Sequence, residues 1–136
     1  MGAGELVRIV DRRRPRHVDT PILVVEDDPH LLGMLVLLLE EGDYPLVAVA
    51  DGLEAMQSLQ VSRPSLVILD LNVPYVNGDE VGVRIRARYG RTLPIILVTA
   101  SRHGAEIAEA LEAEYLPKPF NVDELLTVVW RCLDQC

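Results

Sequence analysis

Two kinds of hydrophobic pattern alternate along the chain from Thr20 onward. Short aliphatic runs, each bounded by Gly, Pro or acidic residues, are typical of buried strands. They occur at 21–25, 46–49, 65–69, 93–98 and 115–116. Apolar residues at helical spacing lie between and after them, at 29–41, 53–61, 78–89, 104–114 and 122–133. This alternation predicts an α/β fold, with one parallel five-stranded sheet covered by helices on both faces.

Local signals support three of the predicted helix ends. Pro29 stands near a helix start, where its missing N–H costs little. Gly42 follows two glutamates and is typical of a helix stop. Asn121, with Glu124 three residues later, resembles a capping box at the start of the last helix.

The length of the chain suits one folded domain, and its charge distribution sets the first residues apart from the rest. The 136 residues suit a single domain, and the net charge of −8 argues against a general nucleic-acid binder. The first twenty residues carry five arginines and a net charge of +2, so the rest carries −10. We expect a flexible basic arm at 1–19 and a folded domain at 20–136. The arm is interpreted as a solvated leader, with a nucleic-acid or membrane arm as the alternative.

The remaining composition excludes several other classes. The longest apolar stretch, 31–39, is about half the length that spans a bilayer, and no secretory signal precedes it. We therefore expect a cytoplasmic protein without membrane contact. Two cysteines, Cys132 and Cys136, are too few for a disulfide scaffold or a structural zinc site, and we interpret them as reduced thiols.

Chemically active residues follow four of the predicted strands. Parallel sheets of this class bind ligands beyond the carboxyl ends of their strands. At these ends stand the acidic triplet 26–28 after the first strand, Asp70 after the third, Thr99 at the fourth and Lys118 after the fifth. Each has an ordinary structural explanation, but their joint placement predicts one polar crevice.

The charges of this crevice favour a hard divalent cation. Crowded carboxylates repel one another unless a cation neutralises them, and oxygen ligands suit Mg²⁺. Glu26, Asp27 and Asp70 supply three negative charges, which Mg²⁺ and the single lysine of the chain, Lys118, balance. One oxygen of Asp70 is then free to attack a phosphoryl group, and the cations stabilise charge on the transferring oxygens.

The strings PILVVEDDP, LVILDLNVP, IILVTA and YLPKPF together resemble the receiver domain of two-component response regulators. The resemblance extends from Pro21 to about Leu133. It implies a flavodoxin-like, doubly wound sheet with strand order 2-1-3-4-5. It also implies a cis peptide bond between Lys118 and Pro119.

The resemblance further implies a role for each matching residue. Asp70 is the implied phosphoacceptor, which Thr99 and Lys118 assist by contacting phosphoryl oxygens. The implied metal ligands are Asp27, Asp70, the backbone carbonyl of Asn72 and, through a water molecule, Glu26. Tyr115 occupies the position of the aromatic switch residue, with an ordinary half-buried strand tyrosine as the alternative. Asp28 is interpreted as a helix cap, with cation binding as the alternative.

The implied function is a phosphorylation switch rather than an enzyme. A histidine kinase or histidine phosphotransfer protein donates to Asp70, and a downstream effector protein or domain responds. No direct nucleic-acid contact is expected. Two alternatives are a phosphatase that uses an aspartyl-phosphate and an interaction module that is never phosphorylated. Against the first, Asn72 stands where such enzymes place a second acid.

Two departures from the family pattern stand out. Only 18 residues separate Thr99 from Lys118, a few fewer than is usual. We therefore expect the helix between them to be short or differently docked. The predicted helix 29–41 is apolar almost all round, which indicates either a partner-binding surface or leucines half-covered by neighbours.

Overall fold

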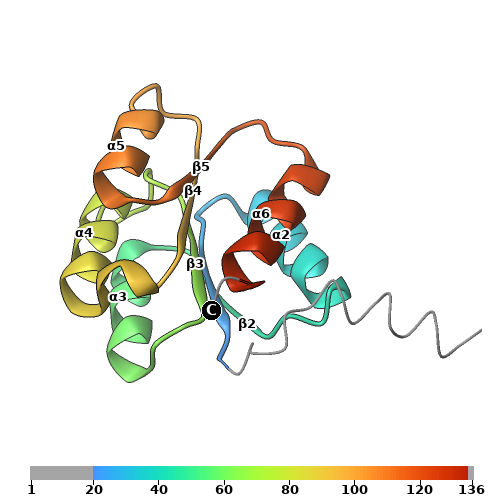
Figure 1. Ribbon diagram of the computed structural model, residues 1–136, viewed down its shortest axis with the longest axis horizontal. Coiled ribbons are helices and arrows are strands. Elements are labelled where there is room, and N and C mark those ends of the chain that lie inside the picture. The colour runs from blue at the N-terminus through green and yellow to red at the C-terminus, as the bar shows by residue number, and fades with distance from the viewer. Residues whose placement is uncertain (1–19, 135–136) are drawn as a thin grey trace, which may run out of the picture.

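The computed structural model describes residues 20–134, in which a parallel sheet lies between two layers of helices (Figure 1). The strands are β1 (Ile22–Val25), β2 (Leu46–Val49), β3 (Leu66–Leu69), β4 (Ile95–Thr99) and β5 (Glu114–Pro117). The helices are α2 (Pro29–Glu41), α3 (Gly52–Val61), α4 (Gly78–Tyr89), α5 (Gly104–Leu111) and α6 (Val122–Asp134), with a 3₁₀ turn η1 (Gly90–Thr92) after α4. The arm predicted at 1–19 and Cys136 lie outside the described residues.

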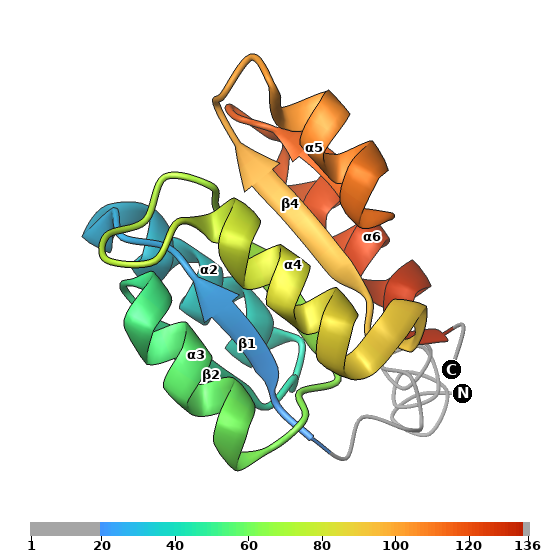
Figure 2. The ribbon, with the colours of Figure 1, turned by 90° about the vertical axis from the view of Figure 1, so that its left-hand side faces the viewer.

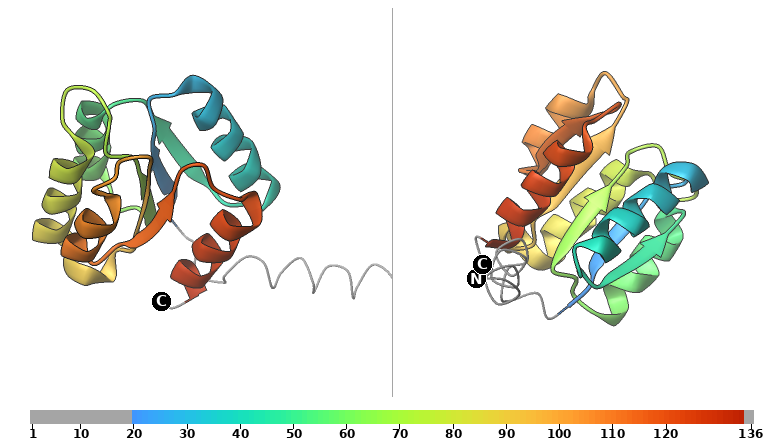
Figure 3. Two further views of the ribbon diagram at one scale, coloured as in Figure 1. Left: turned by 90° about the horizontal axis from the view of Figure 1, so that it is seen from above. Right: turned by 90° about the vertical axis from the view of Figure 1, so that its right-hand side faces the viewer.

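The strand order is β2-β1-β3-β4-β5, as predicted. All four pairings are parallel, and β1, which lies between β2 and β3, aligns Ile22 with Leu46 on one side and with Leu66 on the other. The chain therefore runs outward from β1 to β2, crosses back to β3 and continues to β5. This reversal places the carboxyl ends of β1 and β3 side by side. The left view of Figure 3 shows the sheet between its two layers of helices.

Alternate residues of each central strand contribute to two separate cores. Ile22 and Val24 of β1 face α2 and α6, whereas Leu23 and Val25 face α3, α4 and α5. Figures 1 and 2 show the same division of the helices between the two faces of the sheet. Because both faces are buried, β1, β3 and β4 consist almost entirely of aliphatic residues, which is why short apolar runs predicted them well.

Polar side chains cap the helices where the sequence predicted. The Asp28 carboxylate accepts a hydrogen bond from the His30 N–H at 3.0 Å and begins α2. At α6, Asn121 Oδ1 accepts from the Asp123 N–H, and the Asn121 N–H donates to Glu124, which completes the capping box. Gly42 ends α2. These contacts satisfy backbone groups that a helix end otherwise leaves unpaired.

Helix α5 ends three residues earlier than the helical pattern predicted. Glu112 adopts a left-handed conformation with φ of 54°, and the Ala113 N–H donates to the Ala108 carbonyl at 2.8 Å. These features form a Schellman-type helix end, a position that Gly usually occupies. The helix is therefore short, as the spacing between Thr99 and Lys118 led us to expect.

Arg86 of α4 fastens this shortened connection to the rest of the domain. Its guanidinium donates hydrogen bonds to four backbone carbonyls: those of Gly90 at 2.7 Å, Leu93 at 2.6 Å, Glu112 at 3.2 Å and Leu111. Two of these carbonyls lie at the end of α5 and two lie in the turn that leads into β4. One side chain thus satisfies two acceptors at the end of α5 and two in the turn before β4.

Replacing Arg86 with alanine is expected to lower the free energy of unfolding by about 2 kcal/mol, since hydrogen bonds from a charged donor are lost together. Arg84→Ala on the same helix is the control. Arg84 pairs with Glu80 in an exposed i,i+4 ion pair, which contributes at most about 0.5 kcal/mol. Urea unfolding of both variants measures the difference. Equal effects of the two substitutions would contradict this account.

The apolar helix α2 is only partly covered. Leu35 and Leu39 are buried, and Leu31, Leu32 and Leu38 pack against the same core, as expected for leucines that neighbours half-cover. Met34 and Leu37 remain 37% and 63% exposed. Among the described residues, none of the helices has the length and apolar character needed to cross a membrane.

Candidate functional site

The fold brings the strand-end residues of the sequence together at one edge of the sheet. Glu26 and Asp27 follow β1, Asp70 follows the neighbouring strand β3, and Thr99 is the last residue of β4. Glu26, Asp70 and Thr99 are buried. Three buried polar side chains at adjacent strand ends require partners within the site.

Lys118 is the central partner. Its ammonium Nζ lies 2.9 Å from Oε1 of Glu26 and 2.9 Å from Oδ2 of Asp70. The Lys118 side chain is 20% exposed, whereas those of Glu26 and Asp70 are 3% and 6% exposed. The Lys118–Pro119 peptide bond is cis, and the Lys118 N–H donates to the Thr99 carbonyl at 3.0 Å. The predicted proximity of Lys118 and Asp70 is therefore present, together with a contact to Glu26 that the sequence did not predict.

This cluster contains more negative than positive charge. Burial raises the pKa of Glu26, and the hydrogen bonds from Lys118 and the Asp28 N–H only partly offset this effect. Burial lowers the pKa of Lys118, but its contacts with Asp70 and Glu26 outweigh burial and raise that pKa overall. One ammonium thus serves two buried carboxylates, while a third, Asp27, stands beside them.

This third carboxylate completes an arrangement that fits a metal ion. One carboxylate oxygen each from Glu26, Asp27 and Asp70 lies within 4.8 Å of the other two, and the Asp27 side chain is exposed. Oδ1 of Asp70 accepts a hydrogen bond from the Asn72 N–H at 3.3 Å, which holds Asn72 against the cluster. Three hard oxygen donors with excess negative charge and an open side match the preferences of Mg²⁺.

Asp28 takes no part in this cluster. Its carboxylate caps α2, while its backbone N–H donates to Oε2 of Glu26 at 3.1 Å. The acidic triplet is therefore divided: Glu26 and Asp27 face the site and Asp28 serves the helix, as the sequence interpretation proposed.

Thr99 and Tyr115 meet at Gly104. A Cβ on Gly104 would lie 2.6 Å from Cε1 of Tyr115 and 2.8 Å from Cγ2 of Thr99. The Tyr115 side chain is 36% exposed, and Oγ1 of Thr99 accepts from the Ser101 N–H at 3.1 Å. The missing side chain at Gly104 thus allows the tyrosine ring to approach the threonine.

Two further glycines position the site, and sequence reasoning missed them. A Cβ on Gly78 would lie 2.0 Å from the carbonyl oxygen of Asp70, and one on Gly52 would lie 1.8 Å from that of Val76. The loop from Asp70 to α4 therefore packs directly on helix starts. One feature of the sequence could have indicated these close approaches: α3, α4 and α5 each begin with Gly, a residue that disfavours helices.

Comparison with known proteins agrees with this geometry. The family model described as "Response regulator receiver domain" matches residues 22–130. The DNA-binding response regulator MtrA of Mycolicibacterium smegmatis is 37% identical over 111 residues, which are 79% of this chain and 48% of the relative. The transcriptional regulatory protein TctD of Salmonella typhimurium is 37% identical over 107 residues, 76% of this chain and 47% of the relative. The chain thus spans about half the length of the curated relatives it matches.

A solved structure shows a similar fold. The response regulator TrrA of Thermotoga maritima, in complex with Mg²⁺ and BeF, superposes with a TM-score of 0.76. It is 36% identical, and the match covers 84% of this chain and 99% of that one. The five-stranded doubly wound fold is thus shared with receiver domains of one signalling family.

Proposed function

Since the chain belongs to the family of response regulator receiver domains, we propose that Asp70 accepts a phosphoryl group from a histidine kinase or a histidine phosphotransfer protein. A downstream effector protein or domain then responds to the altered conformation. The observation that carries this proposal is the buried Asp70 carboxylate, whose Oδ2 lies 2.9 Å from Lys118 and which shares its site with Glu26 and Asp27.

The transfer forms a bond between an Asp70 carboxylate oxygen and phosphorus while the phosphorus–nitrogen bond of the donor breaks. The electron pair of that bond returns to the donor imidazole. Lys118 remains protonated because its pKa is raised, so it supplies positive charge to the transferring oxygens. Thr99, at the adjacent strand end, is the candidate to donate its hydroxyl proton to a phosphoryl oxygen.

A bound Mg²⁺ ion supplies further positive charge for the phosphoryl oxygens. We assign it to Asp27 and Asp70, with the backbone carbonyl of Asn72 as a third ligand and Glu26 acting through a water molecule. The support is the carboxylate cluster and its excess negative charge. Asp27 is exposed and therefore accessible to an entering ion.

Tyr115 and Thr99 are the candidates for transmitting the signal. A phosphoryl group on Asp70 draws the Thr99 hydroxyl toward it, and the space this leaves allows the Tyr115 ring to turn inward. Their close approach across Gly104 supports this coupling. Two packings of one aromatic ring provide the two states that such a switch needs.

Acetyl phosphate with Mg²⁺ tests the assignment of the phosphoacceptor. We expect the chain to gain the mass of one phosphoryl group, and peptide mapping to locate it at Asp70. Asp70→Asn, of nearly equal size, should gain none. A gain of mass in Asp70→Asn would place the phosphoacceptor at another residue. If neither the wild type nor Asp70→Asn gained mass, the result would favour an interaction module that is not phosphorylated.

Magnesium is expected to stabilise the chain through Asp27. An ion that binds only the folded state at ten times its Kd adds about 1.4 kcal/mol, which is a rise of several degrees in Tm. Asp27→Ala should abolish this rise, which differential scanning fluorimetry measures. The control is Asp28→Ala, which removes the α2 cap and costs about 1 kcal/mol but should retain the full magnesium-dependent rise. The reverse pattern would assign the metal to Asp28.

A further inference from the structure

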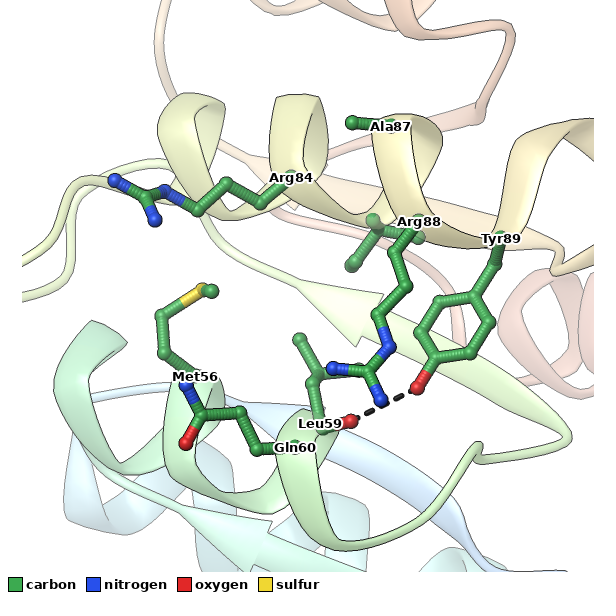
Figure 4. A pocket seen from close by; sticks show the side chains of 8 residues that line it. Met56, Leu59, Gln60, Arg84, Ala87, Arg88 and Tyr89 are labelled. Atoms are coloured by element: carbon green, nitrogen blue, oxygen red, sulfur yellow. Dashed lines mark hydrogen bonds between the residues drawn. The ribbon is translucent and has the colours of Figure 1, made fainter.

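A pocket between α3 and α4 lies away from the phosphorylation site. Its volume is about 380 Å³. It is lined by the middle and C-terminal parts of the two helices, with Met56, Leu59 and Gln60 on one side and Arg84 and Arg88 on the other (Figure 4). Because helices in this fold run opposite to the strands, their C-terminal ends lie toward the opposite end of the sheet from Asp70.

The floor of the pocket is apolar, and a hydrogen bond connects the two helices that form its walls. Leu59 and Ile85 are buried, and Met56 is half-buried beside them. The Tyr89 hydroxyl donates a hydrogen bond to the Leu59 carbonyl at 2.8 Å, which ties the end of α4 to the end of α3. A methionine in such a floor adapts its shape to an incoming apolar group.

Arginines at the pocket carry positive charge that ion pairs among residues 20–134 neutralise only in part. The Tyr89 ring has the Arg88 guanidinium 5.4 Å from its centre and that of Arg63 at 5.8 Å. Within residues 20–134, neither of these two arginines forms an ion pair with a carboxylate. Arg84, one turn before Arg88, makes only an exposed pair with Glu80.

This concentration of arginine contrasts with the charge of the whole domain. From residue 20 onward the net charge is −10, yet Arg84 and Arg88 line this pocket and Arg63 lies over the ring of Tyr89, another lining residue. Guanidinium groups around an apolar pocket, of which only that of Arg84 has an exposed carboxylate partner among the described residues, are complementary to carboxylates that flank an apolar side chain. Arg, Tyr and Met are also enriched in the centres of protein interfaces.

We propose that this pocket docks an acidic peptide segment of a protein partner, which inserts one apolar side chain between α3 and α4 while its carboxylates pair with Arg84 and Arg88. The volume is near the lower end of the range of about 300–1,000 Å³ for small-molecule pockets. Its rim is exposed, which suits a side chain of a partner better than an enclosed ligand. A nucleic acid fits less well, because a long polyanion also meets the acidic remainder of the domain.

Titration of the ¹⁵N-labelled full chain with a blocked pentapeptide, four glutamates around a central leucine, tests the proposal by NMR. We expect shifts at Met56, Gln60 and Arg88, and weaker binding as NaCl is raised. Arg88→Glu should weaken binding by about tenfold or more. An alanine-centred peptide should also bind about tenfold more weakly.

Two control variants distinguish binding at the pocket from a general effect of charge and from phosphorylation. Arg102→Glu makes the same charge change at an exposed arginine outside the pocket and should leave the affinity within about twofold of the wild type. Asp70→Asn should bind like the wild type, so a failure of phosphorylation would not affect this result. Absence of shifts at the pocket, an equal loss in Arg102→Glu, or tighter binding of a single-stranded oligonucleotide than of the peptide would overturn the proposal.

Discussion

Gly78→Ala is expected to lower the free energy of unfolding by about 3 kcal/mol and to impair phosphorylation of Asp70. The added methyl group would lie 2.0 Å from the Asp70 carbonyl oxygen and 2.7 Å from Cα of Leu71. Both are backbone atoms, so the loop that carries the phosphoacceptor must move to make room. Chemical denaturation and the rate of labelling by acetyl phosphate measure the two effects.

Gly33→Ala is the matched control for this substitution. Gly33 lies within α2, is exposed, and has no heavy atom within 4 Å of an added Cβ. Alanine there is expected to stabilise the chain by about 0.5–1 kcal/mol through helix propensity and to leave labelling unchanged. Similar effects at both glycines would show that the close approach to Asp70 has no energetic consequence.

Lys118→Met, which removes the ammonium and keeps an unbranched side chain one atom shorter, is expected to destabilise the chain at neutral pH by about 2 kcal/mol. Two buried carboxylates then lose their shared cation. This expected destabilisation is smaller than that for a fully buried ion pair because the Lys118 side chain is 20% exposed. We also expect labelling of Asp70 to slow by about 100-fold or more, since a positive charge beside the transferring oxygens is lost.

The pH dependence identifies the cause of this destabilisation. Burial already raises the pKa of Glu26, and loss of Lys118 raises it further. A carboxyl group whose pKa is higher in the folded state destabilises the fold once ionised, so stability returns as the pH falls through that folded-state pKa. The deficit of Lys118→Met should therefore shrink on acidification and on addition of Mg²⁺. Lys118→Arg keeps the charge and should show a smaller deficit; equal deficits would point to packing rather than charge.

Most of the fold could be predicted because β1, β3 and β4 are buried on both faces of the sheet. That burial requires uninterrupted aliphatic residues in these strands, and it leaves polar residues only where they end. Asp70 and Thr99 were therefore conspicuous in the sequence, and the structure places them at neighbouring strand ends. Lys118 was conspicuous as the single lysine of the chain, and its contact with Asp70 agrees with the predicted charge balance.

The unpredicted details depend on contacts between distant segments. The end of α5 has no glycine to mark it, because Glu112 itself takes the left-handed conformation and Arg86, 26 residues earlier, supports the carbonyls there. The requirement for Gly78 comes from the Asp70 carbonyl across a loop. Periodicity reports which face of an element is buried, and it carries no information about such pairwise approaches.

The four carbonyl contacts of Arg86 bear on how this domain can be recombined with others. The segment from α5 to β5, which includes Tyr115, is an obvious unit to exchange when chimeric regulators are engineered. Its carbonyls at Leu111 and Glu112 depend on a donor in α4, outside the exchanged unit. Transplanted alone, the segment leaves those acceptors unsatisfied in its new host. The portable unit is therefore the segment together with the helix that bears Arg86.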